Sequence, residues 1–245
     1  IESEVAALLE EVREVYAWFD LPEEFVFSTK PAKALGDPAL WEKAESMIEK
    51  ALRDSGAKWR LNAGDGAFYA PKIDIIVRDA LGREWQTATV QVDLVMLPER
   101  FDLTYTDEAG ERVRPIAIHR AIYGSLERFI GILVEHYAGA FPFWLAPEQV
   151  VIIPIADRHL EFVTAGAAVL RAAGIRVSID DSSNRMQNKI RLAQEQKVPL
   201  MLVVGDKEIE AGGAAPRWRD GTQEPTTSWE ALAAALAARA AARTA

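Results

Sequence analysis

The chain has 245 residues, of which 49% are hydrophobic and 27% are charged, and its formal net charge is −9 at pH 7. This length fits one large domain or two ordinary ones with a buried core. The absence of cysteine excludes disulfides and thiolate metal ligands from these residues. No apolar run is long enough for a membrane span or a signal peptide, so we expect a cytoplasmic protein that does not contact a membrane.

The charge is unevenly distributed along the chain. Acidic and basic residues balance from Glu148 onward, so the first 147 residues carry the whole net charge. An acidic total argues against a nucleic-acid binder, but a local basic patch can still bind RNA. The chain opens at Ile1 inside a predicted helix, with no capping residue before it. We therefore expect a piece of a longer protein.

The first part of the chain predicts two helices and two short extended segments. Apolar residues recur at helical spacing over residues 3–19, and residues 21–27 follow as an extended segment. An aspartate–proline pair at 37–38 is typical of a helix N-terminus and predicts a helix to about Leu52. Residues 59–61 form a candidate short strand.

Strands joined by short turns follow. Residues 72–78 and 84–97 are rich in strand-forming residues and flank a turn at 79–82. Residues 101–105 and 113–118 flank another turn. Because short turns join only antiparallel strands, we expect an antiparallel sheet.

The pattern changes after a helix at residues 125–137, which is apolar on most faces and is therefore expected to be buried. Beyond a proline-bounded segment at 142–147, strands alternate with helices, which is typical of a parallel α/β sheet. The expected elements are strands at 149–155, 175–179 and 200–204, helices at 158–173 and 184–196, and a last helix capped by Ser228 that runs to about Arg243. The sequence thus predicts an α+β domain with an antiparallel sheet at 1–146 and an α/β domain with a mixed, largely parallel sheet at 147–245.

A short motif marks the start of the apolar helix. The motif Gly-Ser-Leu-Glu-Arg at 124–128 places a carboxylate and a guanidinium in the first helical turn. An arginine there is costly unless its planar cation stacks or meets an anion. From physical chemistry alone, a buried Glu127–Arg128 pair or an arginine that reaches solvent explains the motif. The motif also resembles the third signature motif of class II aminoacyl-tRNA synthetases, whose arginine lies against the adenine and phosphates of ATP.

A longer series of motifs is similar to the threonyl-tRNA synthetases. Phe-Tyr-Ala-Pro-Lys-Ile-Asp at 68–74 and Ile-His-Arg-Ala at 118–121 resemble two motifs of that family. Further matches, in the family order, are Trp85-Gln86, Gln91–Asp93, Leu97–Phe101, His136–Gly139, Trp144–Pro147, Lys189–Arg191, Lys197–Pro199 and Val203–Glu208. The resemblance implies the C-terminal part of a class II catalytic domain at 1–146 and an anticodon-binding domain at 147–245.

Only the resemblance makes His119 a candidate zinc ligand, since a single histidine at a strand end is more often structural. In the family the matching histidine binds Zn2+ together with a Cys and a His from an earlier part of the catalytic domain, which are not among these residues. Zinc with three protein ligands keeps open positions. The amine and hydroxyl of threonine fill them, which discriminates against valine. Serine carries both groups, and the family removes it with a separate editing domain.

The resemblance also assigns residues to the two small substrates. Tyr69 packs beside the zinc-bound threonine, Gln91 and Ser125 line the same pocket, and Gln86 and Arg128 lie near ATP. Strict strand alternation puts Gln86 and Gln91 on opposite faces. Either a bulge lies between them or one faces away, and we favour Gln91. Gln91 and Arg128 are the residues expected to take part in catalysis.

Three departures from the family affect the same sheet. Thr87-Ala88 stands where the family often has Cys-Gly, and Ala70 stands where it has glycine. Residues 92–98 form a segment one residue longer than usual. An extra residue either makes a bulge or reverses the facing downstream, near Leu97.

Five cations in the second domain are candidate tRNA contacts. Arg185, Lys189 and Arg191 lie on a predicted helix, and Arg217 and Arg219 flank a tryptophan. A solvated helix face explains such charges in general. The resemblance makes them a surface for RNA, whose loops are read by stacking and edge contacts. Residues 182–187 depart from the common Arg-Asn-Glu-Lys form of the family, so its anticodon contacts do not transfer residue by residue.

The resemblance implies ATP-dependent activation of threonine and its transfer to tRNA(Thr), with Mg2+ and Zn2+, in a homodimeric full-length enzyme. Positioning and charge neutralisation would supply most of the catalysis. Because the family's first two motifs are absent from these residues, the chain alone is expected to be inactive. One alternative is a non-catalytic synthetase-like tRNA-binding or regulatory relative, which would bind no zinc. Another class II specificity, such as prolyl, is a third interpretation, which the motifs at 68–74 and 118–121 argue against.

Overall fold

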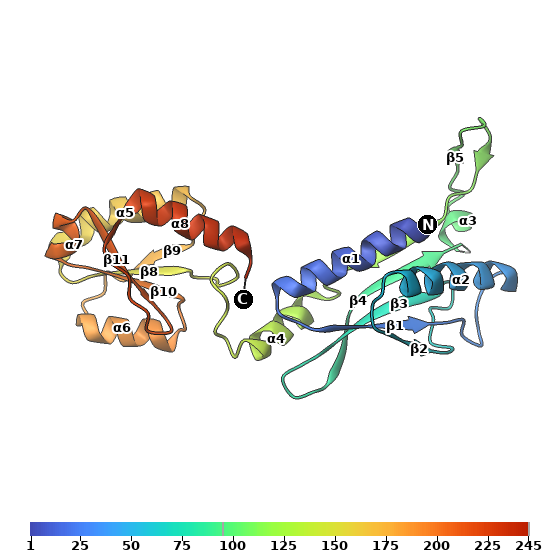
Figure 1. Cartoon of the computed structure of the whole chain (residues 1–245), viewed down its shortest axis with the longest axis horizontal. Coiled ribbons are helices and arrows are strands. Elements are labelled where there is room, and N and C mark those ends of the chain that lie inside the picture. The colour runs from blue at the N-terminus through green and yellow to red at the C-terminus, as the bar shows by residue number, and fades with distance from the viewer. Residues whose placement is uncertain (95, 245) are drawn as a thin grey trace. The chain divides into compact units, whose positions relative to one another are not determined.

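The computed structural model describes residues 1–94 and 96–244. Contacts within the chain divide it into two compact units, Ile1–His136 and Tyr137–Ala245, and each is described by itself (Figure 1). The domain bounds expected from the sequence, 1–146 and 147–245, stay a prediction. Among the residues that the structure describes, no helix combines the length and apolarity needed to cross a membrane.

The first unit is built on a five-stranded sheet. Its helices are α1 (Glu2–Trp18), α2 (Pro38–Asp54), α3 (Leu97–Arg100) and α4 (Leu126–His136). The sheet contains β1 (Glu23–Ser28), β2 (Trp59–Asn62), β3 (Lys72–Arg78), β4 (Glu84–Asp93) and β7 (Ala117–Ala121). β5 (Tyr105–Thr106) and β6 (Arg112–Val113) form a separate hairpin.

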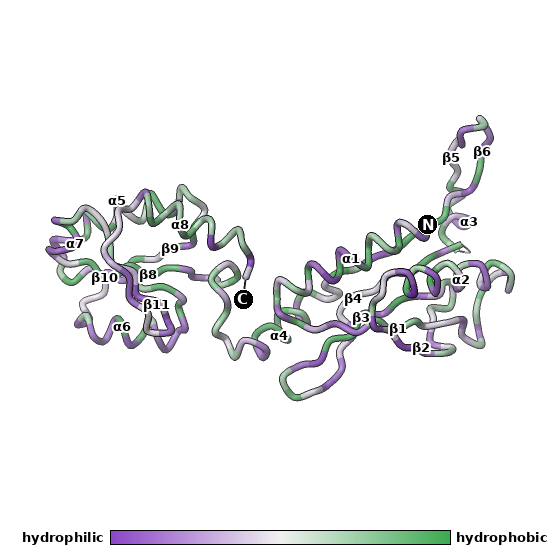
Figure 2. The backbone as a smooth tube through the Cα atoms, in the orientation of Figure 1, coloured by the Kyte–Doolittle hydropathy of each residue, from purple (hydrophilic) through white to green (hydrophobic). Residues whose placement is uncertain are grey.

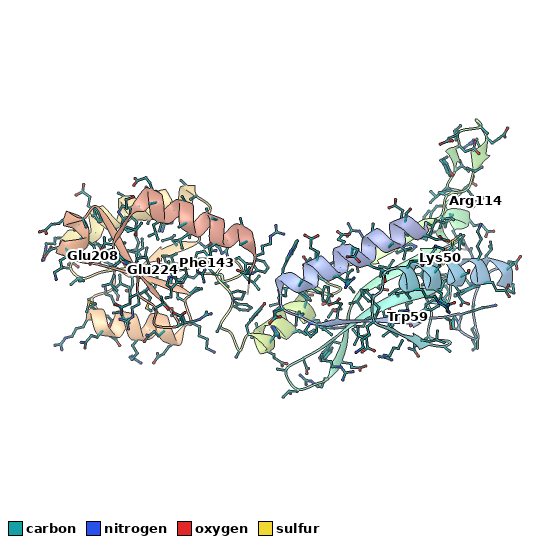
Figure 3. The ribbon with its side chains drawn as sticks, viewed as in Figure 1. Lys50, Trp59, Arg114, Phe143, Glu208 and Glu224 are labelled. Carbon is teal, nitrogen blue, oxygen red and sulfur yellow. The ribbon has the colours of Figure 1, made fainter. Side chains whose placement is uncertain are left out.

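The sheet has the strand order β2-β1-β3-β4-β7. The pairs β1–β3, β3–β4 and β4–β7 are antiparallel, which confirms the expected sheet type. At one edge, β2 pairs in parallel with β1, because α2 lies between them as a crossover connection. Trp59 on this edge strand, labelled in Figure 3, packs edge-on against Phe27 with ring centroids 6.2 Å apart.

Helices α1 and α2 cover one face of the sheet (Figure 1). Hydrophobic and hydrophilic residues alternate along α1 (Figure 2), as expected for a helix with one buried stripe. The stripe consists of Val5, Leu9, Val12, Val15 and Tyr16. Asp37 caps α2 by accepting a hydrogen bond from the backbone nitrogen of Ala39 at 2.9 Å, which confirms the predicted N-terminus.

The strand predicted over 84–97 is wrong beyond Asp93. The carboxylate of Asp93 accepts hydrogen bonds from the backbone nitrogens of Met96 (2.7 Å) and Leu97 (3.0 Å). Those nitrogens are thereby taken from any strand ladder, and the chain turns into α3. The one-residue-longer segment at 92–98 contains Val95, which lies outside the described residues.

Two further expectations for this unit need correction. Residues 101–105 are not a strand apart from Tyr105, and the strand expected at 113–118 is divided between β6 and β7. The helix at 125–137 is present as α4 but is not buried on most faces. It buries Phe129, Ile132 and Leu133, while Leu126, Ile130 and Val134 are 60%, 57% and 44% exposed. An all-apolar helix sequence does not reveal which face meets a partner within the same chain.

The second unit is an α/β structure. Its strands are β8 (Val150–Pro154), β9 (Val177–Ile179), β10 (Leu200–Val204), β11 (Gly213–Trp218) and β12 (Thr227–Ser228). Its helices are the 3-10 turn Asp157–His159, α5 (Leu160–Ala172), α6 (Met186–Glu195), α7 (Asp206–Glu210) and α8 (Trp229–Ala242). The sequence predicts β8, β9, β10, α5, α6 and α8, but not α7, β11 or β12.

The sheet of this unit has the order β12-β11-β10-β8-β9. β8 pairs in parallel with both β9 and β10, whereas β11 is antiparallel to β10, so the mixed, largely parallel sheet is confirmed. The core on one face joins the strands to α5 and α8, and a smaller core on the other face joins them to α6. Ser228 caps α8 as predicted, since its Oγ accepts from the nitrogen of Ala231 at 3.3 Å.

Gly166 allows α5 and α8 to approach each other. A Cβ at this position would lie 2.2 Å from the ring of Trp229. We therefore expect Gly166→Ala to lower the free energy of unfolding by about 1–3 kcal/mol, because the strain of overpacking exceeds the gain in helix propensity. Chemical denaturation followed by circular dichroism measures this difference.

Gly131 in α4 is the matched control, since a Cβ there would have no atom within 4 Å. Gly131→Ala should stabilise the protein by about 0.5–1 kcal/mol through helix propensity alone. If both alanine variants were stabilised equally, the close contact at Gly166 would be disproved.

Candidate functional site on the open sheet face

The face of the first sheet opposite α1 and α2 has polar side chains from three strands. Along β3, Ile73, Ile75 and Val77 are fully buried on the helix side, so Lys72 and Asp74 project to the other side. Gln91 on β4 is the register partner of both Lys72 and His119, which places these side chains on the same face. We call this polar surface the open face.

A β-bulge at Thr87 determines which residues of β4 reach the open face. Ile75 pairs with Ala88 and Ile76 pairs with Gln86, which leaves Thr87 without a partner on β3. The extra residue reverses the alternation, so Gln86 projects on the same side as Gln91. Of the two possibilities left by the sequence, the structure has the bulge.

Buried groups hold the bulge in place. The hydroxyl of Tyr16, on α1, is hydrogen-bonded to Thr87 Oγ1 at 2.7 Å and to the carbonyl oxygen of Ile122 at 2.8 Å. Gly124 has a φ of +58°, and a Cβ there would lie 2.7 Å from the carbonyl oxygen of Thr87. The bulge is therefore fixed both to α1 and to the turn that leads from β7 into α4.

Tyr69, Gln91 and His119 lie together at the β4–β7 edge of the open face. The Tyr69 hydroxyl donates to Gln91 Oε1 at 2.6 Å, and the rings of Tyr69 and His119 are edge-on with centroids 6.1 Å apart. His119 Nε2 lies 3.3 Å from Oδ2 of the buried Asp93, and its side chain is 30% exposed. A metal-binding histidine commonly contacts a carboxylate through its other ring nitrogen, so His119 fits as one metal ligand.

Among the described residues, His119 does not have two further ligands nearby. Within residues 1–94 and 96–244, no group of three His, Cys, Asp or Glu side chains could hold a metal ion. A zinc site at His119 would therefore need ligands from beyond these residues.

The buried carboxylate of Asp74 lies at the centre of the open face and is 4% exposed. It accepts hydrogen bonds from Gln86 Nε2 at 2.5 Å, Lys72 Nζ at 2.7 Å and Ser28 Oγ at 2.9 Å, and a longer one from Thr89 Oγ1 at 3.4 Å. Asp74 thus links β1, β3 and β4 across the sheet.

Arg128 is exposed at the N-terminal end of α4. Its guanidinium lies 5.8 Å from the ring centroid of Trp85, and its NH1 donates to the carbonyl oxygen of Gln86 at 3.4 Å. Ser125 Oγ donates to Glu127 at 2.8 Å, so Glu127 is paired with Ser125 in a solvent-exposed position. The buried Glu127–Arg128 pair is wrong, and the arginine reaches solvent beside an aromatic ring, which lowers the cost of its position.

Trp85 is held in turn by Asp79. Burial alone would raise the pKa of the Asp79 carboxyl, but hydrogen bonds from the Trp85 indole, from Arg83 and from the backbone of Leu81 outweigh it and hold this pKa well below the usual range. Asp79 therefore stays ionised and fixes Trp85, on whose ring Arg83 also lies at 5.7 Å.

The five candidate cations of the second unit lie in different environments. Lys189 is 6% exposed and donates to the carbonyl oxygen of Asp180 at 2.7 Å. Arg219 donates to the carbonyl oxygens of Phe141, Lys197 and Ala140, and burial lowers its pKa. Both side chains are therefore engaged in holding loops of the fold.

The other three cations are more available. Arg185 is exposed before α6, and Arg191 pairs with Glu195 one turn on at 2.5 Å. Arg217 lies opposite Met201 on β10, so it is on the α6 side of the sheet. Its Nε is buried without a hydrogen-bond partner among the described residues, which is a costly state unless a ligand satisfies it.

The two units correspond to two known sequence families. Residues 1–137 match the "tRNA synthetase class II core domain (G, H, P, S and T)" family, and residues 149–239 match the "Anticodon binding domain" family. The chain belongs to the class II tRNA synthetase core family, followed by an anticodon-binding domain.

Comparison with individual proteins shows which members of this family the chain is similar to. The chain is 50% identical over 240 residues to "Threonine--tRNA ligase" of Anaeromyxobacter dehalogenans strain 2CP-1, covering 98% of this chain and 37% of that relative. It thus spans little more than a third of the length of the curated relatives it matches. Its fold superposes with a TM-score of 0.88 and 36% identity on the "RNA binding domain of Threonyl-tRNA synthetase" of Cryptosporidium parvum Iowa II, covering 97% of this chain and 60% of that one. A prolyl-tRNA synthetase from the same organism shares the fold alone, with a TM-score of 0.60 and 19% identity over 98% of this chain and 49% of that one.

Sequence reasoning missed several residues that build the site. It did not single out Tyr16, Asp74 or Asp93. Tyr16 lies in the apolar stripe of a predicted helix, so its hydroxyl was an available signal, because buried polar groups are retained where they have partners. Asp74 and Asp93 alternate with apolar residues, so the pattern puts them on the opposite face and does not predict their burial.

Tyr16→Phe tests the buried link to the bulge. Burial raises the pKa of the Tyr16 hydroxyl from 10.0 to about 12, so the fold favours the protonated form. The stabilisation by this group is fully present below pH 10 and is lost as the pH rises toward 12. We expect wild type to exceed the Phe variant by about 1–3 kcal/mol in unfolding free energy at neutral pH, with the difference shrinking between pH 10 and 12. Urea unfolding of both proteins across this range measures it, and a difference independent of pH would contradict the assignment.

Proposed function

We propose that this chain is part of a threonine–tRNA ligase that activates threonine with ATP and transfers it to tRNA(Thr). The observation that supports this most is the grouping of Tyr69, Gln91 and His119 on the same face as Gln86. Relatives that are about 50% identical over nearly the whole chain are named as threonine–tRNA ligases, which favours the ligase over a non-catalytic relative.

In this proposal the β4–β7 edge of the open face binds threonine. Tyr69 would lie against the substrate, and its hydroxyl is hydrogen-bonded to Gln91 at 2.6 Å. Ser125 would line the same region. His119 would be one ligand of a Zn2+ ion, which would supply Lewis-acid binding of the amine and hydroxyl. Asp93 holds the imidazole through Nε2 at 3.3 Å and so limits its rotation.

ATP would bind at the other end of the open face. The bulge at Thr87 places the Gln86 side chain at this end of the face. Arg128, from α4, lies beside it and donates to the Gln86 carbonyl oxygen. A guanidinium resting on an aromatic ring is held in one plane, which suits it to stack on a base or to meet phosphates. The reaction leaves negative charge on the phosphates, so Arg128 and Mg2+ would act by charge neutralisation, and Gln91 by positioning the amino acid.

The second unit would bind tRNA(Thr). Arg217 is the strongest of the five candidates, because its buried Nε lacks a partner among residues 1–94 and 96–244. Arg185 and Arg191 lie at the surface of the same side, while Lys189 and Arg219 would act by shaping that surface. We assign the catalytic portion to residues 1–146 and the anticodon-binding portion to residues 147–245, in a cytoplasmic homodimer of the full-length protein.

The full-length gene product should catalyse ATP–pyrophosphate exchange that depends on threonine, and it should contain about one zinc ion per chain. His119→Ala should lose that zinc and lower the exchange rate at least about a hundredfold, since even changes to the groups that support a metal ligand cost about 10–100-fold. Elemental analysis and the exchange assay measure the two effects.

His136→Ala provides the matched control, because His136 ends α4 on the same unit. It should keep its zinc. A wild-type protein without exchange activity would disprove the ligase proposal, and undiminished zinc in His119→Ala would disprove the ligand assignment alone.

Arg217→Ala should weaken binding of tRNA(Thr) by the full-length protein about tenfold or more, the loss typical of one guanidinium contact to a base. Filter binding at fixed salt measures it. Arg171→Ala is the control, since Arg171 lies on α5, on the other face of the same sheet. Equal losses in the two variants would mean that the effect is general electrostatic attraction and not contact at Arg217.

A further inference from the structure

The orientation of the Gln86 amide follows from the charge of Asp74. An ionised carboxylate can only accept hydrogen bonds, whereas an amide has one accepting and one donating end. Asp74 Oδ1 lies 2.5 Å from the Gln86 side chain, so Gln86 must turn its NH2 group toward Asp74. Its carbonyl oxygen, Oε1, then points away, and Gln86 is exposed.

Donors surround both oxygens of Asp74. The ammonium of Lys72 lies 2.7 Å from Asp74 Oδ2 and the Ser28 hydroxyl 2.9 Å from the same oxygen. The carboxylate therefore acts as an acceptor in each of these contacts. No hydrogen-bond partner of Gln86 Oε1 is found in the described part of the chain, so this oxygen is available to a ligand.

We propose that Asp74 is a positioning residue that orients Gln86 so that Oε1 accepts a hydrogen bond from ATP. This inference rests on the proposed function and deepens it. The donors that ATP offers are the two ribose hydroxyls and the exocyclic amine of adenine. Gln91 has the opposite polarity, because the Tyr69 hydroxyl occupies its Oε1 and leaves its NH2 group. The open face thus presents an acceptor at Gln86 and a donor at Gln91.

An exchange of carboxylate and amide tests the orientation directly. In Asp74→Asn, the remaining oxygen is held by Lys72, so the new NH2 group faces Gln86. Gln86 must then turn over and present its own NH2 group to ATP. In Gln86→Glu, two carboxylates face each other and repel. In the double variant, the new amide at position 74 donates its NH2 group to the new carboxylate at position 86, whose other oxygen again offers an acceptor.

The experiment is ATP–pyrophosphate exchange by the full-length protein, with the KM for ATP and for threonine measured separately. Each single variant should raise the KM for ATP about tenfold, the upper range of the effect of one lost hydrogen bond between neutral groups. The double variant should return to within about threefold of wild type. The KM for threonine should change less than about threefold throughout. Asp54→Asn, the control, makes the same exchange at the end of α2, on the other side of the sheet, and should leave both constants unchanged.

ATP analogues identify the donor. Wild type should bind one of 2′-deoxyATP, 3′-deoxyATP and purine riboside triphosphate about tenfold more weakly than ATP. Asp74→Asn should bind that analogue and ATP equally.

Three outcomes overturn the inference. The first is a double variant no better than the product of the two single losses. The second is Asp74→Asn with the wild-type KM for ATP, and the third is equal loss of affinity for ATP and threonine, which would mean a general structural role. A wild-type protein without exchange would instead disprove the proposed function, and with it this inference.

Discussion

The hydrogen bond between the Tyr16 hydroxyl and Thr87 fixes the β-bulge on which the arrangement of the site depends. In a regular β4 with Thr87 in the ladder, Thr87 would lie on the open face and Gln86 would face α1 and α2. The same hydroxyl is bonded to Ile122, and Gly124 approaches Thr87 closely. One buried phenol therefore sets the relative positions of a core helix, the bulged strand and the turn before α4, and so of the residues that we assign to ATP and to threonine.

Buried carboxylates organise the rest of the open face. Asp74 orients the side chains at the centre of this face. Asp93 ends β4 and contacts His119. At the hairpin turn, Asp79 holds Trp85 by accepting a hydrogen bond from its indole. Each accepts several hydrogen bonds, which offsets the cost of burying a carboxylate. In the second unit, cations hold the loops instead, because Lys189 and Arg219 donate hydrogen bonds to backbone carbonyl oxygens. An apparent basic patch in the sequence is thus divided between structural and available charges.

Much of the fold could be predicted because local signals were strong. The Asp37 cap, the hairpin around residues 79–82 and the alternation after residue 149 each have a direct physical cause. The end of β4 was missed because Asp93 ends it through a side chain, and strand-forming residues continue beyond it. Strand alternation left two possibilities, a bulge between Gln86 and Gln91 or one of the two side chains facing away. The sequence could not distinguish them, because the contact that holds the bulge comes from Tyr16, 71 residues away from Thr87 in sequence. Burial of α4 was overestimated for a related reason, because composition does not show which face has a partner.

The central claim is that the bulge brings the residues assigned to ATP and to threonine onto one face of one sheet. A crystal structure of the full-length protein with threonine and a non-hydrolysable ATP analogue tests this most directly. We predict that Gln86, Gln91 and His119 all contact ligands on the open face, with Gln86 Oε1 within hydrogen-bonding distance of the nucleotide. A regular β4 with Gln86 packed against α1, or a nucleotide bound elsewhere, would contradict it.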